Sequence, residues 1–559
     1  MRRVRILSLI LLSAASACAG SGTAGSPAPR AATAAAITPA DLRVRESIFS
    51  DDSMLGRRAG TIGNVRGNAY IASEAARLGL RPAGSDGGFL QRVPMVSYSV
   101  DSAKSTLHAG STALAAFHEF YPYQAEFDLP ARPLDVAGVV YIGTLADTGS
   151  LPEREGLRGK LVVFRSHPEA TSLQGPSLGP EGKLGLISGI AFTGIDPILQ
   201  SYDQYLRTPR LVVRDSAAAA GGETQPRMLF LPTAAIPAFF GKPLDQLQRG
   251  DTGATIHGDV AFAPSELTAT NVVGIIEGSD PVLKGEYVAL GAHNDAIGIV
   301  EPVDHDSLRA YNSVVRPRGA NDPAGTPTPE QWGQVKTVLD SLRRIRPARV
   351  DSIVNGADDD GSGSMGLLEI AEAVSKGGTK PRRSLLFVWH TGEESGLQGS
   401  RWFTDHPTVP RDSIVAQINI DMIARGGPKD EKVGGPGYIQ AIGTRRLSTE
   451  LGDLAEAVNT EGKHGLVFDY SYDADGHPDN FYCRSDHYMY ARYGIPIAFF
   501  STGGHRDYHQ VTDEAQYLDY DKFVKVTSFV EDLAMRVADL DHRPVVDKPK
   551  PDPNGVCKQ

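Results

Sequence analysis

The clearest pattern along the chain is a set of short, continuously apolar runs, each followed by glycine or by polar residues. Runs of this kind are typical of strands buried on both faces of an α/β sheet. An amphipathic segment at 64–78, followed by Gly79, predicts a helix that ends at a left-handed glycine. A second amphipathic segment, 330–345, predicts another helix. The apolar runs lie at 271–276, 287–292 and 385–389.

The pattern changes between residues 131 and 266, where β-rich runs such as 139–142 and 161–164 alternate with turn clusters. This segment carries no group of acids and histidines at ligand spacing. It separates residues 38–130 from residues 267–540. Residues 541–559, rich in Pro, Lys and Asp, predict a disordered tail.

The first residues predict an export signal over 1–17, because three arginines precede an apolar run too short to span a bilayer. Residues 15–18 resemble a lipobox, which would place a lipid on Cys18; the alternative is an ordinary signal cleaved after Ala17 or Ala19. Residues 18–37, rich in Gly, Ser, Ala and Pro, read as a flexible tether. We therefore expect an exported protein, either a periplasmic or cell-envelope lipoprotein or a secreted protein, whose membrane attachment is at most that lipid.

Composition and charge exclude several kinds of partner and metal site. The 559 residues are 41% hydrophobic and 22% charged, which is typical of a globular protein with more than one domain. A net charge of −11 and the lack of a long basic run argue against nucleic acid as a partner. Three cysteines can build neither a disulfide scaffold nor a four-thiolate zinc site, so any metal must bind His and carboxylates. Cys483 and Cys557 either pair or remain free thiols.

Five segments in the second half of the chain end in residues that bind metal ions. The adjacent acids Glu393 and Glu394 follow the apolar run at 385–389 and would repel each other at a buried site unless a cation lay between them. Ligands at the carboxyl ends of strands are where an open α/β sheet places its site. The residues alone do not choose between Asp358, Asp359 and Asp360. The segments are 291–295, 356–363, 391–397, 419–422 and 507–509.

In the order His, Asp, Glu-Glu, Asp, His, the sequence resembles the M28 family of co-catalytic zinc exopeptidases over about residues 40 to 540. The resemblance implies an α/β fold with a mixed, mostly parallel sheet flanked by helices. It also implies that 38–130 is the N-terminal part of the peptidase domain, that 131–266 is an inserted protease-associated domain, and that 267–540 is the catalytic domain. It also implies two Zn²⁺ per chain, with a carboxylate that bridges them and a Glu as general base. The residues so assigned are His293 and Asp421 on one zinc, Glu394 and His509 on the other, Asp359 as the bridge, Asp295 orienting His293, and Glu393 as the base.

The function expected from this resemblance is an aminopeptidase that removes N-terminal residues from peptides, with Tyr508 donating a hydrogen bond to the developing oxyanion. A carboxypeptidase or glutaminyl cyclase on the same fold, or a binding protein without activity, are the alternatives. Arg484 and Arg506 are the cations that a carboxypeptidase could use. His390 reads as a packed histidine, and 485–487 as a structural loop near the pocket.

One departure from the family pattern is the interval of 66 positions between His293 and Asp359, of which residues 299–350 are the excess. Loop insertion costs little free energy, so the ligands can still converge. We expect the insertion to overhang the active site and to favour short peptides.

Overall fold

The computed structural model describes residues 33–123, 134–144, 152–166, 182–196, 199, 206–214, 227–322, 325–426 and 435–559. The predicted signal 1–17, Cys18 and most of the tether lie outside these ranges. Within them, no helix combines the length and the apolar character needed to cross a membrane.

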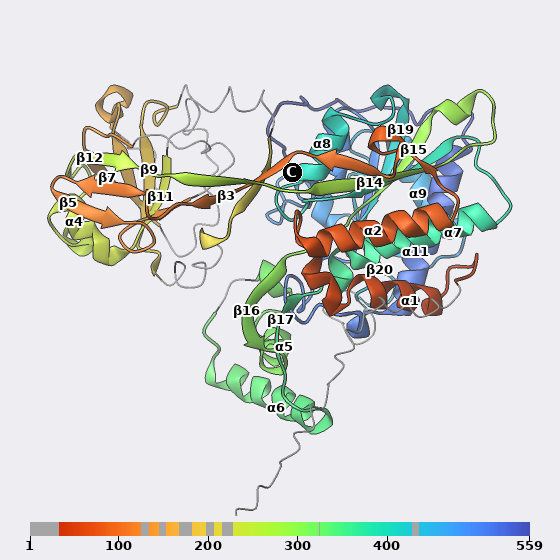
Figure 1. Ribbon diagram of the computed structural model, residues 1–559, viewed down its shortest axis with the longest axis horizontal. Coiled ribbons are helices and arrows are strands. Elements are labelled where there is room, and N and C mark those ends of the chain that lie inside the picture. The colour runs from red at the N-terminus through yellow and green to blue at the C-terminus, as the bar shows by residue number, and fades with distance from the viewer. Residues whose placement is uncertain are drawn as a thin grey trace, which may run out of the picture.

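A nine-stranded mixed sheet forms the centre of the main body (Figure 1). Four neighbouring strands run parallel, in the spatial order β18, β15, β19 and β22, while β14 and β20 run antiparallel to their neighbours β18 and β22. The predicted α/β fold with a mixed sheet is confirmed. The strands are β1 (Arg81–Pro82), β2 (Leu90–Val93), β14 (Ala269–Ile276), β15 (Tyr287–His293), β18 (Ser384–His390), β19 (Ile414–Ile420), β20 (Tyr438–Ile442), β21 (Val467–Asp469) and β22 (Ile497–Ser501).

Helices cover both faces of this sheet, as the continuous burial of its central strands requires. The larger core lies beneath α1, α2, α7, α9 and α11, and a smaller core lies beneath α8 and α10. The predicted helix at 64–78 is α2, and Gly79 follows it with a φ of +80°. These helices are α1 (Pro39–Phe49), α2 (Ile62–Arg77), α7 (Gly363–Lys376), α8 (Gln398–Asp405), α9 (Thr449–Glu461), α10 (His487–Ala491) and α11 (Tyr520–Ala538).

A β-rich body lies beside the main body, joined to it through β3 and β14 (Figure 1). It has its own apolar cores, which include Leu107, Val139 and Phe239. Its sheets are β6-β11-β9-β8-β7, β12-β4-β5 and β10-β3-β13. The strands are β3 (Met95–Val100), β4 (Thr106–Ala109), β5 (Thr112–Ala115), β6 (Tyr121–Pro122), β7 (Val139–Thr144), β8 (Leu161–Arg165), β9 (Gly189–Thr193), β10 (Arg210–Val213), β11 (Arg227–Leu231), β12 (Ile256–Asp259) and β13 (Phe262–Glu266), with the short helix α4 (Ile236–Phe240).

The β-rich body begins earlier in the chain than the sequence predicted. Strand β4 pairs with β12, and β6 pairs with β11, so residues 106–122 belong to this body rather than to the predicted segment 38–130. Their partners lie more than 100 positions further along the chain. Local composition carries no sign of such distant pairing, so the sequence predicts the start of the β-rich body too late in the chain.

The insertion forms a small subdomain of β16 (Gly298–Asp304), α5 (His305–Val314), α6 (Pro329–Ile345) and β17 (Val350–Val354), which projects from the main body (Figure 1). Helix α6 matches the predicted segment 330–345 and starts with a capping box at Thr328. Of its residues, Val335 is the buried one. The helix therefore reaches into solvent, while residues 319–322 return to the main body, where the Ala320 N–H donates to the Tyr508 carbonyl over 3.2 Å.

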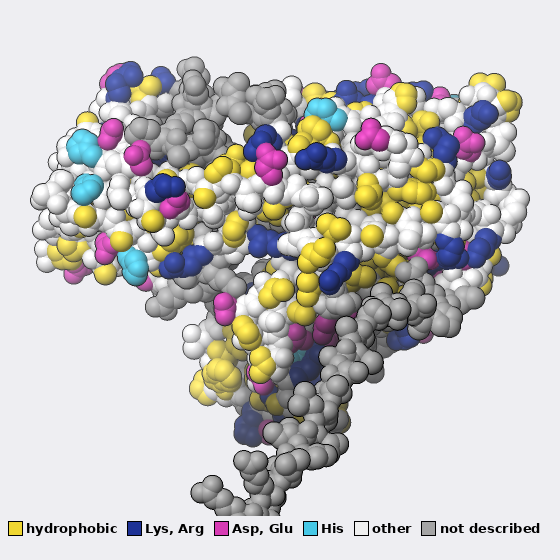
Figure 2. Space-filling model, in the orientation of Figure 1, with side chains coloured by type: hydrophobic (Ala, Val, Ile, Leu, Met, Phe, Trp, Pro, Cys, Tyr) yellow, Lys and Arg dark blue, Asp and Glu magenta, His cyan; other side chains and the backbone are white. Residues whose placement is uncertain are grey.

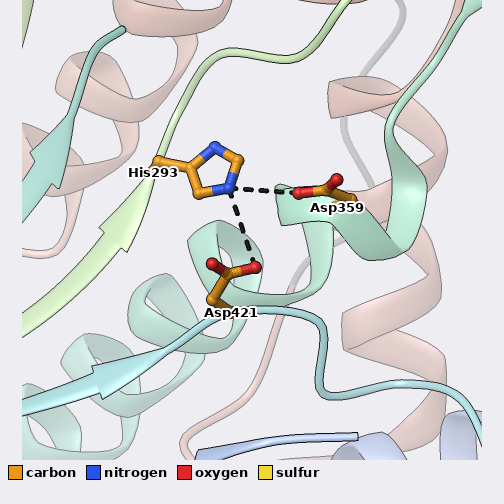
Figure 3. A group of neighbouring side chains, drawn as sticks. All are labelled: His293, Asp359 and Asp421. Carbon is orange, nitrogen blue, oxygen red and sulfur yellow. Dashed lines mark ion pairs between the residues drawn. The ribbon is translucent and has the colours of Figure 1, made fainter. Parts of the chain in front are cut away.

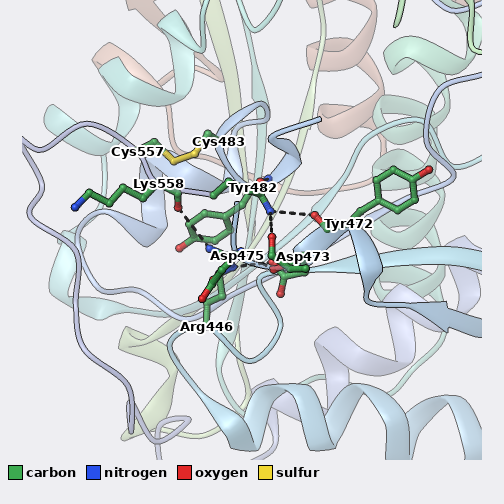
Figure 4. Close-up of a disulfide and its surroundings, with 10 residues drawn as sticks. Arg446, Tyr472, Asp473, Asp475, Tyr482, Cys483, Cys557 and Lys558 are labelled. Atoms are coloured by element: carbon green, nitrogen blue, oxygen red, sulfur yellow. Dashed lines mark hydrogen bonds and ion pairs between the residues drawn. A yellow bond between two sulfur atoms is a disulfide. The ribbon is translucent and has the colours of Figure 1, made fainter. Parts of the chain in front are cut away.

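The predicted disordered tail is wrong, because residues 541–559 pack along the main body. A disulfide joins Cys557 to Cys483 (Figure 4). The Tyr482 N–H donates to the Gln559 side chain over 2.9 Å, and the Thr449 N–H donates to Asp547 over 2.9 Å. The tail is polar in composition, and its anchors lie far away in the sequence, so composition alone pointed to disorder.

On the face shown in Figure 2, acidic and basic side chains are interspersed.

Candidate metal centre

The predicted ligands meet at one edge of the sheet because they follow neighbouring parallel strands. His293 is the last residue of β15, and Asp421 follows β19 directly. Glu394 lies four residues after the end of β18, and His509 lies in the loop after β22. Since these four strands are parallel, their carboxyl ends lie together at the same edge. The fifth residue, Asp359, comes from the turn that precedes α7.

These five side chains form two groups that share Asp359, and each group has the geometry to hold a metal ion. In the first, His293 Nε2 lies 3.1 Å from Asp359 Oδ1 and 3.7 Å from Asp421 Oδ1 (Figure 3). In the second, His509 Nε2 lies 3.0 Å from Asp359 Oδ2 and 2.9 Å from Glu394 Oε2. The two oxygens of Asp359 therefore face different groups, as a bridging carboxylate requires.

The local backbone decides between the three consecutive aspartates. Asp360 is turned into the protein, where its carboxylate accepts from the N–H groups of His293 at 3.0 Å and Gly363 at 2.8 Å. Asp358 accepts from the Ala424 N–H and lies 3.1 Å from His505 Nε2. Asp359 is left facing the two histidines of the groups. Gly356 makes the turn possible, because its φ is +59° and a Cβ there would lie 2.3 Å from the Asp359 carbonyl oxygen.

The charges of this cluster are poorly balanced without a cation. Burial raises the pKa of Glu393 well above its usual range; the charge of His293 lowers it, but the carboxylates of Glu394 and Asp421 raise it again. Burial and the carboxylate of Asp359 also raise the pKa of Glu394. Burial lowers the pKa of His509, but the carboxylates of Glu394 and Asp359 outweigh it and raise this pKa to about 10. A buried group of acids with these properties is stabilised by bound positive charge.

Unsatisfied polar atoms support the same reading. His293 Nε2, Asp359 Oδ2 and Glu394 Oε1 are buried and make no hydrogen bond with any residue in the described ranges. Buried polar atoms without partners are costly, and metal coordination is one way to satisfy them. Imidazole and carboxylate are donors that suit Zn²⁺. The residues present therefore fit a pair of divalent metal ions.

Asp295 contacts His293 through its backbone carbonyl rather than through the carboxylate that the family resemblance implies. His293 Nδ1 lies 3.0 Å from the backbone carbonyl oxygen of Asp295 and 3.8 Å from the carboxylate Oδ1 of the same residue. The carboxylate instead accepts from the Glu393 N–H over 3.1 Å. Asp295 thus links the loop that carries His293 to the loop that carries Glu393 and Glu394.

Glu393 and Tyr508 line a small cavity of about 30 Å³ beside the two groups. Glu393 Oε2 lies 3.9 Å from His293 Nε2, yet Glu393 belongs to neither group. The Tyr508 ring stacks on His509, with 3.9 Å between the ring centroids, and its hydroxyl accepts from Arg484 over 3.1 Å. Asn321, from the insertion, also lines this cavity. The insertion therefore contributes to the pocket through its returning loop, whereas α6 does not line it.

Sequence reasoning missed Arg57, which is fully buried beneath the centre. Its guanidinium donates to the carbonyl oxygens of Asn355 at 2.7 Å and Gly356 at 2.8 Å, and to that of Asn294 at 3.3 Å. It thus ties together the two turns that carry His293 and Asp359. Its role was hidden from the sequence because the three carbonyl groups that it ties together lie more than 200 positions away.

The other side chains discussed for the site lie around it. His390 is buried, with Nε2 3.0 Å from the Tyr490 hydroxyl and Nδ1 3.4 Å from Asp486, as a packed histidine would be. Ser485 contacts Asp421 directly, since its hydroxyl donates to Oδ2 over 2.8 Å. Arg506 points away to the insertion, where it donates to Ser313 over 3.1 Å.

Comparison with known proteins relates part of the chain to peptidases. Residues 338–534 match Peptidase family M28. The chain is 30% identical over 172 residues to leupeptin-inactivating enzyme 1 of Streptomyces exfoliatus, covering 30% of this chain and 34% of that protein. It is 27% identical over 194 residues to leucine aminopeptidase 1 of Trichophyton rubrum, covering 32% and 48%. The chain thus spans between a third and a half of the length of these curated relatives.

A solved structure shares the fold over a longer stretch. The aminopeptidase from Aneurinibacillus sp. strain AM-1 has a TM-score of 0.51 at 15% identity, covering 92% of this chain and 97% of that chain. The sequence match to the family is narrower than the expected span of 40 to 540. It includes Asp359, Glu393, Glu394, Asp421 and His509 but not His293, which the long insertion separates from the rest.

Proposed function

We propose that this chain is a zinc aminopeptidase that removes N-terminal residues from peptides, because residues 338–534 match Peptidase family M28. The observation that carries the proposal is the pair of three-residue groups sharing Asp359. We propose that His293 and Asp421 hold one Zn²⁺, that Glu394 and His509 hold the other, and that Asp359 bridges them. Metal ions bound there would supply a water of lowered pKa and a positive charge for the substrate carbonyl oxygen.

Glu393 is the proposed general base, because it lines the cavity beside the groups without belonging to either. Its carboxylate takes a proton from the attacking water and passes it to the nitrogen of the leaving amine. The Tyr508 hydroxyl, which accepts from Arg484, keeps its own proton free to donate to the oxyanion that develops on the substrate. Arg57 and Asp295 keep the ligand-bearing turns in place.

The aminopeptidase reading rests on the charge of the cavity. Asp359, Glu393 and Asp421 line it. With Asp359 and Asp421 assigned to the metal ions, Glu393 is the carboxylate that faces the free ammonium group of a peptide. Arg484 also lines the cavity, but its guanidinium already donates to Asn321, Tyr508 and the Asp479 carbonyl. This engagement disfavours Arg484 as the receptor of a terminal carboxylate, which the carboxypeptidase alternative requires.

We also propose that the chain works outside the cytoplasm. The predicted signal 1–17 and the lipid on Cys18 concern residues that the structure does not describe. The Cys483–Cys557 disulfide supports an oxidising compartment. Peptides are then the partners expected there.

The test of the function is a turnover assay with free aminoacyl peptides and their N-acetylated counterparts, each with and without a zinc chelator. We expect cleavage of the free peptides alone, and loss of that cleavage in the chelator. Cleavage of the acetylated peptides alone would overturn the aminopeptidase assignment, and full activity in the chelator would overturn the zinc dependence.

A further inference from the structure

The loop 505–509, which carries His509, is held from two sides, by the main body and by the insertion. His509 has a φ of +56°, in the left-handed region that residues other than glycine rarely adopt. A backbone conformation of this kind persists where the surrounding structure holds it in place. The contacts of the loop therefore decide where the imidazole of His509 points.

Two of the four carbonyl groups that precede His509 accept hydrogen bonds from the insertion. Asn312 Nδ2, on α5, donates to the Arg506 carbonyl oxygen over 3.0 Å. The Ala320 N–H donates to the Tyr508 carbonyl oxygen over 3.2 Å. The other two carbonyl groups, at positions 505 and 507, accept from N–H groups of residues 508 and 510. Asn312 is fully buried, so its side-chain amide is shielded from water and fixed in direction.

Two further contacts tie the insertion to the same loop. Asp507 is fully buried, with Oδ2 2.8 Å from Arg425 of the main body and Oδ1 3.3 Å from Arg309 Nε of α5. Gly319, with a φ of +58°, packs directly on the loop: a Cβ there would lie 2.7 Å from the Tyr508 carbonyl oxygen and 2.9 Å from the Tyr508 nitrogen. The insertion therefore holds the loop through α5 and through the backbone at 319–320.

We propose that the insertion positions His509 for the second metal ion, with Asn312 and Gly319 as positioning residues. This inference rests on the proposed function and gives the insertion a part in it. His509 shares its ligand group with Asp359 and Glu394, whereas the other group takes His293 and Asp421 from β15 and β19, which the sheet holds in register. Loss of the insertion's contacts should therefore weaken the site that contains His509 and leave the other site intact.

The experiment titrates the metal-free protein with Zn²⁺ against a competing chelator and determines the Kd of each site. The site that His509→Ala abolishes identifies the second site. For Asn312→Ala, which removes the donor to the loop, and for Gly319→Ala, which adds a methyl group against it, we expect the Kd of that site to rise roughly tenfold or more. The Kd of the other site should stay at the wild-type value. Peptide cleavage by Asn312→Ala should be low at limiting zinc and recover when zinc is in excess.

Two glycines provide matched controls, and both variants should keep the wild-type affinities. Gly333→Ala adds the same methyl group on α6 of the insertion, where a Cβ would meet no other described segment within 4 Å. Gly110→Ala, in the β-rich body, reproduces the backbone strain alone, because its φ is also +58° and its surroundings in the described chain are open.

Unchanged affinities in both Asn312→Ala and Gly319→Ala, or an equal loss at the two sites, would overturn the positioning role and leave the aminopeptidase function standing. A wild-type protein that binds no zinc would overturn the function itself, and this inference with it.

Discussion

Ser485 donates a hydrogen bond to Oδ2 of Asp421 over 2.8 Å, which leaves Oδ1 of Asp421 facing His293. Ser485 in turn accepts from the Asn419 side chain over 3.0 Å. It lies two residues after Cys483, whose disulfide to Cys557 ties this loop to the last part of the chain (Figure 4). Phe481 and Arg484 of the same loop line the acidic cavity. A partly buried covalent link therefore supports the wall of the proposed active site.

Replacing the disulfide should loosen that wall and weaken substrate binding. For Cys557→Ser we expect KM to rise several-fold, with the bound metal unchanged, because no proposed ligand is removed. The disulfide closes a long loop between positions 483 and 557, so its loss should lower the free energy of unfolding by about 2–4 kcal/mol. Thermal unfolding with and without a reductant provides the check. Reduction should lower the Tm of the wild type and leave that of the variant unchanged; equal Tm values for all four samples would contradict the prediction.

Glu393→Gln should lower kcat by roughly 10²- to 10⁴-fold, because glutamine cannot take the proton of the attacking water. The metal content should stay at the wild-type value, since Glu393 is a member of neither ligand group. Steady-state kinetics and elemental analysis on the same preparation measure both quantities. Glu301→Gln, on the exposed part of β16, is the control and should behave as the wild type. A Glu393→Gln protein with wild-type turnover would exclude Glu393 as the base.

Substitution of Asp359 should release more metal than substitution of His509. Asp359 belongs to both ligand groups and His509 to one. After exhaustive dialysis, we therefore expect His509→Ala to retain about half of the wild-type zinc and Asp359→Ala to retain almost none. His257→Ala, an exposed histidine of the β-rich body, should keep the full amount. Equal zinc content in Asp359→Ala and His509→Ala would argue against a bridging role for Asp359.

The parts that the sequence predicted are those in which the signal is local. The runs at 287–292 and 385–389 are buried on both faces, and this burial leaves a continuous apolar stretch that reads as a strand. The ligands follow such strands, and because these strands run parallel, the ligands meet at one edge of the sheet. The choice of Asp359 over Asp358 and Asp360 depended on the family resemblance, because the three side chains are identical and the local backbone alone decides which of them faces the histidines. Arg57, the pairing of β4 with β12 and the anchoring of the tail involve distant partners, and local patterns carry no record of them.

Glu531 gives the fold a pH dependence that is separate from catalysis. It lies on α11, where burial, and then the negative charge of Asp532, raise its pKa to about 7. Well below about pH 4.5 Glu531 is protonated in both the folded and the unfolded chain, so its ionisation does not change the free energy of unfolding. As the pH rises from about 4.5 to 7, the unfolded chain loses this proton first. The free energy of unfolding therefore falls across that window and is lowest above it.

Glu531→Gln should remove this loss, because glutamine stays neutral at every pH. We expect the variant to be about 1–2 kcal/mol more stable than the wild type at pH 8, after allowing for the partial exposure of the side chain, and equally stable at pH 4.5. Urea unfolding of both proteins at the two pH values measures the difference, with Glu301→Gln as an exposed control. A gain of the same size at both pH values would mean that the substitution acts through packing, and the assigned ionisation of Glu531 would then be wrong.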